Sequence, residues 1–480
     1  MPNSSEPLEI LIEPGTYGYR NAGDTAAFLV AVARLEEQWP AAQTAAFTEA
    51  PDRLRHFAPR LRPYSTKLRD DMLAMCDPNG APARRLPIGT LLRWHLERGL
   101  RWRPLLRALP SIALRAAARR FSFSRKPGPS AGLDLNRPDR KELERILRSF
   151  SLIAVSGAGG LCDSFLPHAW SVLQLLDIAS YAGVPTALFS QGLGPIENRA
   201  LYAKARSVLP RVDLIGIRER KTSLPLLEEF GVPSGRIHVT GDDTIELAYR
   251  RRAQAPGACL GVNLRVAYYS SVDRELASSV LGSVAQFAKI HGLQTLPVPV
   301  SFVDRESDIQ TVSEALGVPA SDPCAGEPAA VVDLVGRCRM VVTGSYHGAV
   351  FALSQGIPAV ALTRSLYYEN KFLGLADMFG VGCEVVDLSK PVFPEKLLAA
   401  LRRTLDTAPR VREPLLQSAR EQIAASRAAY RRASEYVCAR RGLCRTAPSS
   451  EAARRADPGA EPSRPTEPAH RAETPAMGLV

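Results

Sequence analysis

The sequence predicts an α/β protein of two doubly wound domains that face each other across a cleft. Three observations point to this fold. Apolar runs of strand length alternate with helical patterns in both halves of the chain, glycine-containing turns follow the runs, and the basic segment YRRRAQAPGA, after Ala248, separates the two series. Alternating strands and helices are typical of a parallel sheet covered on both faces. The 480 residues, of which 45% are hydrophobic, suffice for two cores.

The first series opens with the pattern of a strand, a turn and a helix. LEILIE, from residue 8, is followed by a glycine-containing turn and by Phe28, Val32 and Leu35 at helical spacing. Further strands are predicted in SLIAVSGAGG (151–160), PTALFSQGLGP (185–195) and VDLIGIRER (212–220). A helix through LPLLEEFGV follows, and we expect Gly231 to cap it. The first domain is therefore predicted to span 1–250.

The second series begins with the apolar run CLGVNLRV (259–266). The pattern then predicts a helix over 273–290, the strand QTLPVPVSF, a helix over 306–316, the strand CRMVVTGS, a helix over about 347–355 and the strand IPAVALT. Leucines and alanines interleaved with arginines indicate helix from 405 to 445, which we expect to pack back across the domains. The second domain is therefore predicted to span 256–445.

Two segments depart from the alternating pattern. The stretch 50–145 reads as a basic helical insertion, and 84–126 alone holds twelve basic residues and one acidic residue, against a net charge of +12 for the whole chain. Contact with an anionic membrane surface and a solvated structural insertion both stay open as interpretations. No recognised nucleic-acid fold surrounds the segment, so we expect no nucleic acid partner. The segment 446–480, rich in proline and polar residues, is predicted to be a disordered tail.

The start of the chain, MPNSSEPLEILIE, lacks the pattern of a secretory signal, and no window has the length and apolarity of a membrane span. We therefore expect a cytoplasmic protein, peripheral at the inner face of the plasma membrane if 84–126 binds lipid. The eight cysteines form no CxxC pair, which indicates reduced thiols and no metal site. The sequence gives no indication of the oligomeric state.

Four predicted strand ends carry glycine or polar residues, and ligands of parallel α/β sheets bind at such ends. In GTYGYRNAGDT, the residues Asn21, Gly23 and Asp24 lie where a helix begins, and we expect free backbone amides there to face an anion, although Asp24 equally fits an N-cap. Gly159 and Gly160 in SGAGGLCDS permit either ligand approach or tight helix packing.

The other two ends are more specific in their chemistry. SQGLGPIEN places Gln191 and Gly192 before a proline that stops the strand, and both are candidates for ligand binding. Arg218 directly follows an apolar strand, in a sheltered position where a guanidinium typically clamps a ligand.

The stretch VVTGSYHGAVFALSQG joins a buried strand to a helix whose first turn contains His347. Its neighbours Ser345 and Gly348 belong to the same turn. An imidazole at this point lies beside free amides and the positive end of the helix dipole, where an anionic substrate binds and a proton can be passed. The alternative is that His347 caps the helix or satisfies a carbonyl. The four anion-binding loops favour the functional interpretation.

Seven motifs occur in one order over about 370 residues: RNAGDTA, SGAGGLCDS, SQGLGP, IGIRER with TSLPLLEEFGV, VTGDD, SYHGAVFALSQGIPAVAL and YYENKFLGLADMFG. With these motifs the chain resembles the polysaccharide pyruvyl transferase family. The resemblance implies a GT-B-like pair of Rossmann-type domains. It also implies transfer of a pyruvyl group from phosphoenolpyruvate to hydroxyls of a saccharide acceptor, which leaves a cyclic ketal and phosphate and needs no cofactor or metal.

The resemblance also implies roles for individual residues. Arg218, Asp242, His347 and Lys371 fall on the family's arginine, aspartate, histidine and late basic position. On the chemistry of the reaction we expect His347 to act as acid and base, Arg218 to clamp the donor, and Asp242 to orient the acceptor or remove its proton. Arg265 in GVNLRVA is a further candidate for the donor anion, and a strand-edge role is the alternative.

One departure from the family leaves two other interpretations open. The family commonly has arginine where this chain has Ser345, so one contact to the donor is missing or is supplied elsewhere. A GT-B glycosyltransferase that uses a nucleotide sugar is therefore a second reading. A non-catalytic membrane-associated protein that retains the fold is the third. If the chain is a pyruvyl transferase, the acceptor is a cell-surface or exopolysaccharide precursor. The sequence does not indicate whether that precursor is free or lipid-linked.

Overall fold

The computed structural model describes residues 8–66, 69–70, 140–303, 306–317 and 326–441. The chain divides into two compact units, Met1–Val437 and Cys438–Val480. Both sheets belong to the first unit, and of the second only residues 438–441 are described. The predicted basic segment 84–126 and the predicted tail 446–480 lie outside the described residues.

The first sheet has seven parallel strands. They are β1 (Glu9–Glu13), β2 (Gln43–Thr48), β3 (Arg62–Ser65), β4 (Leu152–Val155), β5 (Thr186–Gln191), β6 (Leu214–Ile217) and β7 (Ile237–Val239). Their order in the sheet is β3-β2-β1-β4-β5-β6-β7. The chain therefore builds outward from β1 in one direction and then from β4 in the other, so the switch point of this sheet lies between β1 and β4.

The second sheet has five parallel strands. They are β8 (Cys259–Asn263), β9 (Thr295–Pro297), β10 (Cys338–Thr343), β11 (Ala359–Thr363) and β12 (Cys383–Asp387). Their order is β12-β11-β10-β8-β9, which puts the switch point between β8 and β10. The second sheet is thus also wound in two directions, as the sequence predicts.

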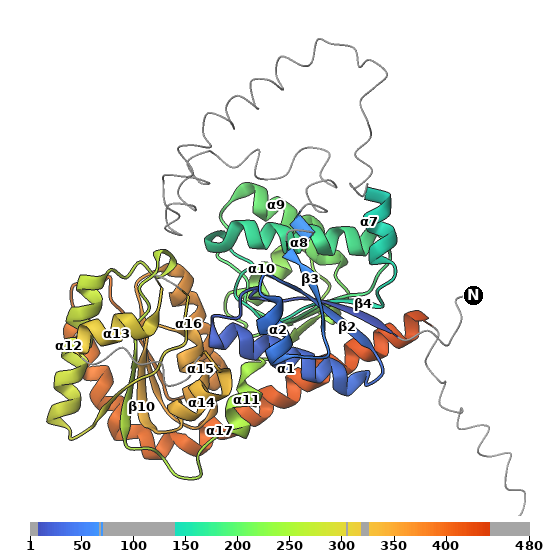
Figure 1. Ribbon diagram of the computed structural model, residues 1–480. Coiled ribbons are helices and arrows are strands. Elements are labelled where there is room, and N and C mark those ends of the chain that lie inside the picture. Colours follow the sequence, from blue (N-terminus) through green and yellow to red (C-terminus); the bar gives the residue numbers. More distant parts are fainter. Residues whose placement is uncertain (1–7, 67–68, 71–139, 304–305, 318–325, 442–480) are drawn as a thin grey trace, which may run out of the picture. The chain divides into compact units, whose positions relative to one another are not determined.

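Helices cover both faces of the sheets (Figure 1). In the first half they are α1 (Ala22–Gln38), α2 (Pro51–Phe57), α7 (Arg140–Leu147), α8 (Leu166–Tyr181), α9 (Arg199–Val208), α10 (Ser223–Glu229) and α11 (Thr244–Arg250). In β1, Ile10 and Ile12 pack in one core with Phe28 of α1, while Leu11 packs in another with Leu175 of α8. This alternation, with both sets buried, is the pattern of a strand covered on both faces.

The second half carries α12 (Arg274–Ile290), α13 (Asp308–Leu316), α14 (Pro328–Val335), α15 (Tyr346–Ser354), α16 (Leu366–Phe379) and α17 (Phe393–Arg441). All nine residues of α15 are buried. One apolar cluster contains Ala26 of α1, Ile245 of α11 and Val350 of α15, so side chains from both halves share a core. That shared core fixes the start of α15 against the ends of the first sheet.

The long helix α17 packs against both sheets (Figure 1). Leu397 and Leu401 join the core of the second sheet, and Val437 joins that of the first. Tyr430 stacks on Phe189 of β5 with ring centroids 3.9 Å apart. The prediction of a helix that packs back over both halves is therefore confirmed, although the helix begins at Phe393, earlier than the predicted residue 405.

Other boundaries also differ from the expectation. β3 pairs with β2 in the first sheet, and α2 connects these two strands, so the basic insertion begins later than the predicted start at about residue 50. The edge strand β3, RPYS, is largely exposed and therefore lacks the apolar run that marks a buried strand. The predicted strand QTLPVPVSF shortens to β9, because prolines supply no amide to a ladder. Gly231 caps α10 as predicted, with φ of +78°.

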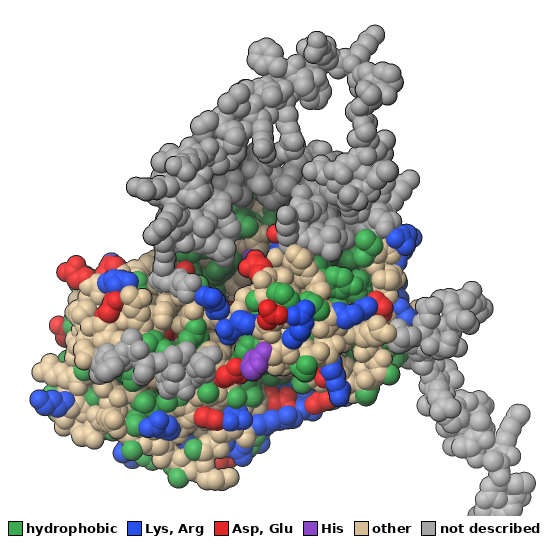
Figure 2. Space-filling view, in the orientation of Figure 1, with side chains coloured by type: hydrophobic (Ala, Val, Ile, Leu, Met, Phe, Trp, Pro, Cys, Tyr) green, Lys and Arg blue, Asp and Glu red, His purple; other side chains and the backbone are tan. Residues whose placement is uncertain are grey.

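Basic and acidic side chains are interspersed over the visible face of the described residues in Figure 2. In the described part of the chain, no helix is both long enough and apolar enough to cross a membrane.

Candidate functional site

Two basic side chains, those of Arg218 and His347, approach the same carboxylate, that of Asp242, and the three residues follow different strands. Arg218 follows β6, Asp242 follows β7, and His347 lies in the first turn of α15, beyond β10. Arg218 Nη1 lies 3.4 Å from Asp242 Oδ2, and His347 Nε2 lies 3.8 Å from the same oxygen. The structure therefore brings the guanidinium of one half and the imidazole of the other to a single point, as predicted.

Asp242 is held firmly at this point. Its Oδ1 accepts hydrogen bonds from the backbone N–H of Thr244 at 2.9 Å and from the Thr244 hydroxyl at 2.6 Å. Burial alone would raise the pKa of Asp242, but the charges of His347 and Arg218 and the bonds from Thr244 lower it. Asp242 is thus an ionised group that fixes its two partners.

Arg218 is buried with most of its hydrogen-bonding capacity unused. It is 2% exposed, and its Nε and Nη2 have no hydrogen-bond partner among the described residues. The guanidinium carbon lies 4.0 Å from the centroid of the Tyr346 ring. A Cβ atom on Gly192 would lie 2.7 Å from Nε, and one on Gly159 would collide with Nη2. Glycine at both positions therefore lets the backbone approach the guanidinium closely, and a buried cation with unpaired donors indicates an anion site.

Lys371 of α16 also lies close to Gly159. A Cβ atom on Gly159 would collide with its Nζ as well as with Arg218. Nζ donates a hydrogen bond to the Tyr367 hydroxyl, which donates in turn to the carbonyl of Gly159 at 3.0 Å. Burial, and then the neighbouring charge of Arg218, lower the pKa of Lys371 well below its ordinary value. An anion placed between Lys371 and Arg218 would relieve both effects.

His347 lies between two carboxylates. Its Nδ1 is 4.0 Å from Asp24 Oδ1, on the side opposite Asp242. Burial lowers the pKa of the imidazole, and Asp242 and Asp24 oppose this. A Cβ atom on Gly23 would collide with the ring, so glycine lets the first turn of α1 approach His347. The imidazole is therefore fixed in position with its proton affinity set by nearby charges.

Several predicted site residues have local partners instead. Asn21 is the N-cap of α1 and accepts bonds from the amides of Gly23 at 3.0 Å and Asp24 at 3.2 Å. The amides expected to face an anion are therefore already used, and Asp24 is not the cap. Gln191 donates to the carbonyl of Ser156 at 2.6 Å, which ties β5 to β4.

Three more predicted site residues make contacts within the fold. Arg265 forms a two-pronged ion pair with Asp308, with Nε–Oδ1 at 2.5 Å and Nη2–Oδ2 at 2.9 Å, and its role toward the donor stays a prediction. A Cβ atom on Gly348 would lie 2.6 Å from Thr343 Oγ1, so this glycine lets α15 pack on β10. Ser345 is buried, and its N–H donates to Thr343 Oγ1 at 2.9 Å.

Two aromatic residues of the site were not predicted from the sequence. Tyr346 supplies the ring under Arg218, and the Lys371 Nζ lies 3.7 Å from the centroid of Tyr367. Adjacency to His347 could have indicated Tyr346, and the spacing of four residues on a helix could have indicated the Tyr367–Lys371 pair.

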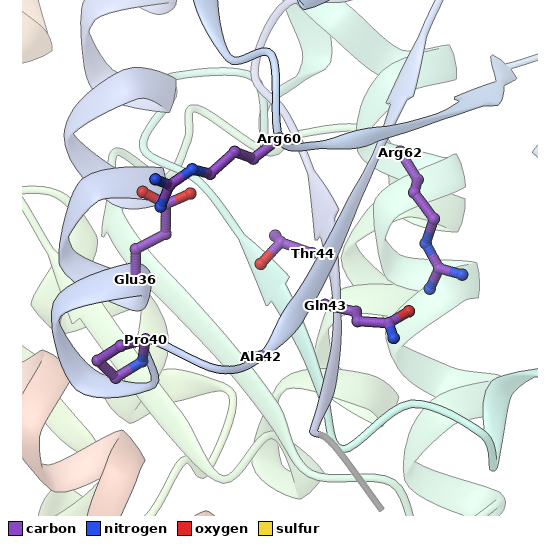
Figure 3. A pocket seen from close by; sticks show the side chains of 7 residues that line it. All are labelled: Glu36, Pro40, Ala42, Gln43, Thr44, Arg60 and Arg62. Carbon is purple, nitrogen blue, oxygen red and sulfur yellow. The ribbon is translucent and has the colours of Figure 1, made fainter.

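A hollow of about 260 Å³ lies elsewhere, beside the amino ends of β2 and β3 (Figure 3). Its lining includes Gln43 and Arg62, which begin these strands. Since parallel α/β sheets bind ligands at the opposite, carboxyl edge, this hollow does not belong to the cluster around Asp242.

Comparison with protein families identifies one match that covers most of the chain. Residues 21–365 match the family model described as polysaccharide pyruvyl transferase. The chain belongs to the polysaccharide pyruvyl transferase family. The match spans Asn21, Arg218, Asp242 and His347, whereas Lys371 lies beyond it. The comparison with curated proteins gave no match.

Two solved structures show the fold of this family member. The complex of S. aureus MnaA with UDP has 12% identity and a TM-score of 0.52, with 92% of this chain and 99% of that chain covered. A candidate UDP-N-acetylglucosamine 2-epimerase from Listeria monocytogenes has 10% identity and a TM-score of 0.51, with 92% and 98% covered. The likeness shows a GT-B fold of two Rossmann-like domains, as the sequence predicts.

Proposed function

We propose that this family member transfers a pyruvyl group from phosphoenolpyruvate to two hydroxyls of a saccharide, forming a cyclic ketal and releasing phosphate. The acceptor is a cell-surface or exopolysaccharide precursor. The observation that carries the proposal is the pair of buried basic side chains Arg218 and Lys371, both close to Gly159, with two unpaired nitrogens on Arg218 among the described residues. Phosphoenolpyruvate bears a phosphate and a carboxylate, and two basic groups match these two anionic groups.

The proposed chemistry begins with proton transfer from His347. In the free protein burial holds its pKa down, so the imidazole gains its proton when the anionic donor binds beside it. The imidazolium then protonates the methylene carbon of the donor, and a sugar hydroxyl attacks the adjacent carbon. Phosphate departs, and the second hydroxyl closes the ketal. Asp242, ionised and bonded by Thr244, positions His347 and Arg218 throughout.

The replacement of the family's arginine by Ser345 favours a second candidate, a glycosyltransferase that uses a nucleotide sugar. Thermal unfolding distinguishes the two, because a ligand that binds only the folded state raises the midpoint. Stabilisation by phosphoenolpyruvate supports the first candidate, and stabilisation by a nucleoside diphosphate alone supports the second. The membrane contact predicted for 84–126 lies outside the described residues, and salt-dependent vesicle binding tests it separately.

The direct test incubates the protein with phosphoenolpyruvate and a panel of saccharides and measures released phosphate and ketal. We expect His347→Ala and Arg218→Ala each to reduce transfer at least about a hundredfold, because they remove the acid and the anion clamp. His291→Ala and Arg220→Ala, at exposed positions, are the matched controls and should stay near wild type. Near-normal rates in both site variants would refute the proposal.

A further inference from the structure

A second cluster of titratable side chains lies at the switch point of the first sheet. Glu13 is the last residue of β1, Tyr17 follows in the next loop, and His168 lies in the first turn of α8. Arg69, which follows β3, joins them through an ion pair with Glu13 at 2.7 Å. The proposed donor chemistry uses none of these four groups. Clusters of interacting titratable side chains at a ligand-binding edge are functional candidates.

The hydrogen bonds of Tyr17 determine which nitrogen of His168 carries the proton. The Tyr17 hydroxyl donates its one proton to Glu13 Oε1 and accepts a bond from Arg69 Nη1. His168 Nδ1 lies 3.0 Å from the same hydroxyl oxygen. Since the hydroxyl proton is already committed to the Glu13 carboxylate, Nδ1 must be the donor of this bond. The Nε2 atom of His168 therefore keeps its lone pair.

That lone pair has no hydrogen-bond partner among the described residues, and two adjacent glycines connect it to the proposed donor site. His168 is partly exposed, and no hydrogen bond to its Nε2 is formed by any described residue. A Cβ atom on Gly160 would lie 2.5 Å from Cδ2 and 2.9 Å from Nε2 of His168. Its chain neighbour Gly159 faces Arg218 and Lys371. Consecutive Cα atoms are about 3.8 Å apart, so Nε2 lies within roughly 12 Å of the two cations. This upper limit is compatible with a small donor at the cations and one acceptor hydroxyl between the donor and Nε2.

The charges around His168 keep its imidazole neutral. Burial, and then the charge of Arg69, lower its pKa to about 4. The groups that face it are Tyr17 from the loop after β1 and Arg69 from beyond β3, with Glu13 behind Tyr17. A neutral ring with a fixed tautomer accepts a hydrogen bond at Nε2 over the physiological pH range. Asp242 is less suited to that task because its oxygens already serve Thr244, Arg218 and His347.

The geometry points to His168 as a catalytic residue whose Nε2 accepts the hydrogen bond of the attacking sugar hydroxyl and takes its proton. The assignment rests on the proposed pyruvyl transfer. As the hydroxyl oxygen bonds to the central carbon of the donor, the double-bond electron pair takes the proton from His347 at the methylene carbon, and the hydroxyl proton passes to His168. Protonation makes the central carbon strongly electrophilic, so a weakly basic imidazole is sufficient. The imidazolium, disfavoured beside Arg69, then releases its proton to solvent.

Within this assignment Tyr17, Glu13 and Arg69 are positioning residues. Glu13→Gln tests them, because the introduced amide can donate to the Tyr17 hydroxyl. That hydroxyl would then donate to His168 Nδ1 and move the imidazole proton to Nε2. Transfer should fall although His168 is still present.

The experiment compares His168→Gln with the matched surface variant His291→Gln in transfer and in phosphoenolpyruvate binding. We expect His168→Gln to lower transfer about a hundredfold, with phosphoenolpyruvate still raising the unfolding midpoint as in the wild type. Transfer within about threefold of wild type would overturn the assignment. A parallel loss of phosphoenolpyruvate binding would overturn it too, because His168 would then belong to the donor side.

Nitrogen-15 spectra of the histidine-labelled wild type provide a readout that needs no variant. We expect His168 to show a protonated Nδ1 and an unprotonated Nε2 down to about pH 5, since its pKa is about 4. In Glu13→Gln we expect the proton of the His168 imidazole on Nε2 and the lone pair on Nδ1. A protonated Nε2 in the wild type contradicts the inference. If the wild type transfers no pyruvyl group at all, the proposed function fails; if it does and His168→Gln does as well, only this inference fails.

Discussion

Two buried arginines, Arg34 of α1 and Arg218 after β6, differ in how their charge is satisfied. Each is 2% exposed. Every nitrogen of Arg34 has a partner: Nη1 lies 3.0 Å from Asp243 Oδ1, Nε donates to Glu246 at 3.0 Å, and Nη2 also bonds Glu246. Arg218 has one weak contact, with Asp242 at 3.4 Å, and two of its nitrogens lack partners within the described ranges. A satisfied buried cation indicates structure, and an open one indicates a ligand.

The network around Arg34 joins three helices. Asp243 and Glu246 belong to the start of α11, and Ser426 and Tyr430 of α17 donate to Asp243, at 2.5 and 2.8 Å. The neighbouring carboxylate, Asp242, faces the site instead. Adjacent aspartates thus serve the two different arginines, and the rigid Arg34 network supports the loop that presents Asp242.

Arg34→Met should have the largest effect on stability. It leaves Asp243 and Glu246 buried without their main cation, so we expect the free energy of unfolding to fall by about 3 kcal/mol. Arg427→Met is the matched control, because Arg427 bonds the same Glu246 from a half-exposed position and should cost about 1 kcal/mol or less. Denaturant unfolding measures both. Equal losses of unfolding free energy in the two variants would show that the greater burial of Arg34 does not make it more important for stability than Arg427.

Arg218→Met should show a different balance of effects. It should lower the unfolding free energy by less than Arg34→Met does, because Asp242 keeps its two bonds from Thr244 and its contact with His347, whereas donor binding should disappear. Phosphoenolpyruvate at about a hundred times its Kd should stabilise the wild type by about 2.7 kcal/mol and this variant hardly at all. Thermal unfolding with and without the ligand measures the difference. A strongly destabilised Arg218→Met would place Arg218 with Arg34 as a structural residue.

Much of the fold could be predicted because buried strands of parallel sheets are apolar throughout. LIAV of β4 is buried at every position, and the strands β5, β6, β8, β10 and β11 were recognised in the same way. Four strands were missed. The edge strands β3, β7 and β12 have no continuous buried run to mark them. Edge strands place fewer side chains in the core, so their sequences need fewer apolar residues and are harder to recognise as strands. The interior strand β2, QTAAFT, is buried after its first residue, but it carries alanine and threonine where large apolar residues would mark a strand.

The site could be predicted only in part. Arg218 and His347 were found because carboxyl ends of parallel strands meet at one edge, whereas Asp242 was indicated only by the resemblance to the family. Arg265 follows a strand in the same way, yet it is paired by Asp308, 43 residues further along the chain. No sequence feature near Arg265 indicates that Asp308 is its partner. His168 and Tyr17 were likewise missed, because their contact joins residues 151 positions apart.

The smallest effect we expect is a proton taken up when the donor binds. Lys371 has its pKa lowered well below its ordinary value, first by burial and then by the charge of Arg218. An anion between Lys371 and Arg218 favours the charged form and raises this pKa. Binding must therefore take up protons and tighten as the pH falls toward the pKa of the free protein.

Calorimetric titration of phosphoenolpyruvate at about pH 8, in buffers with different ionisation enthalpies, measures this uptake. At that pH the phosphate of the donor is fully ionised, its second pKa being about 6. His347 takes up its proton in both proteins, so the difference between the wild type and Lys371→Met reports Lys371. We expect the uptake to be smaller in Lys371→Met by a fraction of one proton. It should persist in Lys221→Met, because Lys221 is half-exposed and lies 3.9 Å from Asp377. Proton release, or an uptake that Lys371→Met leaves unchanged, would mean that the donor does not bind between Lys371 and Arg218. The open donors of Arg218 would then need a different ligand.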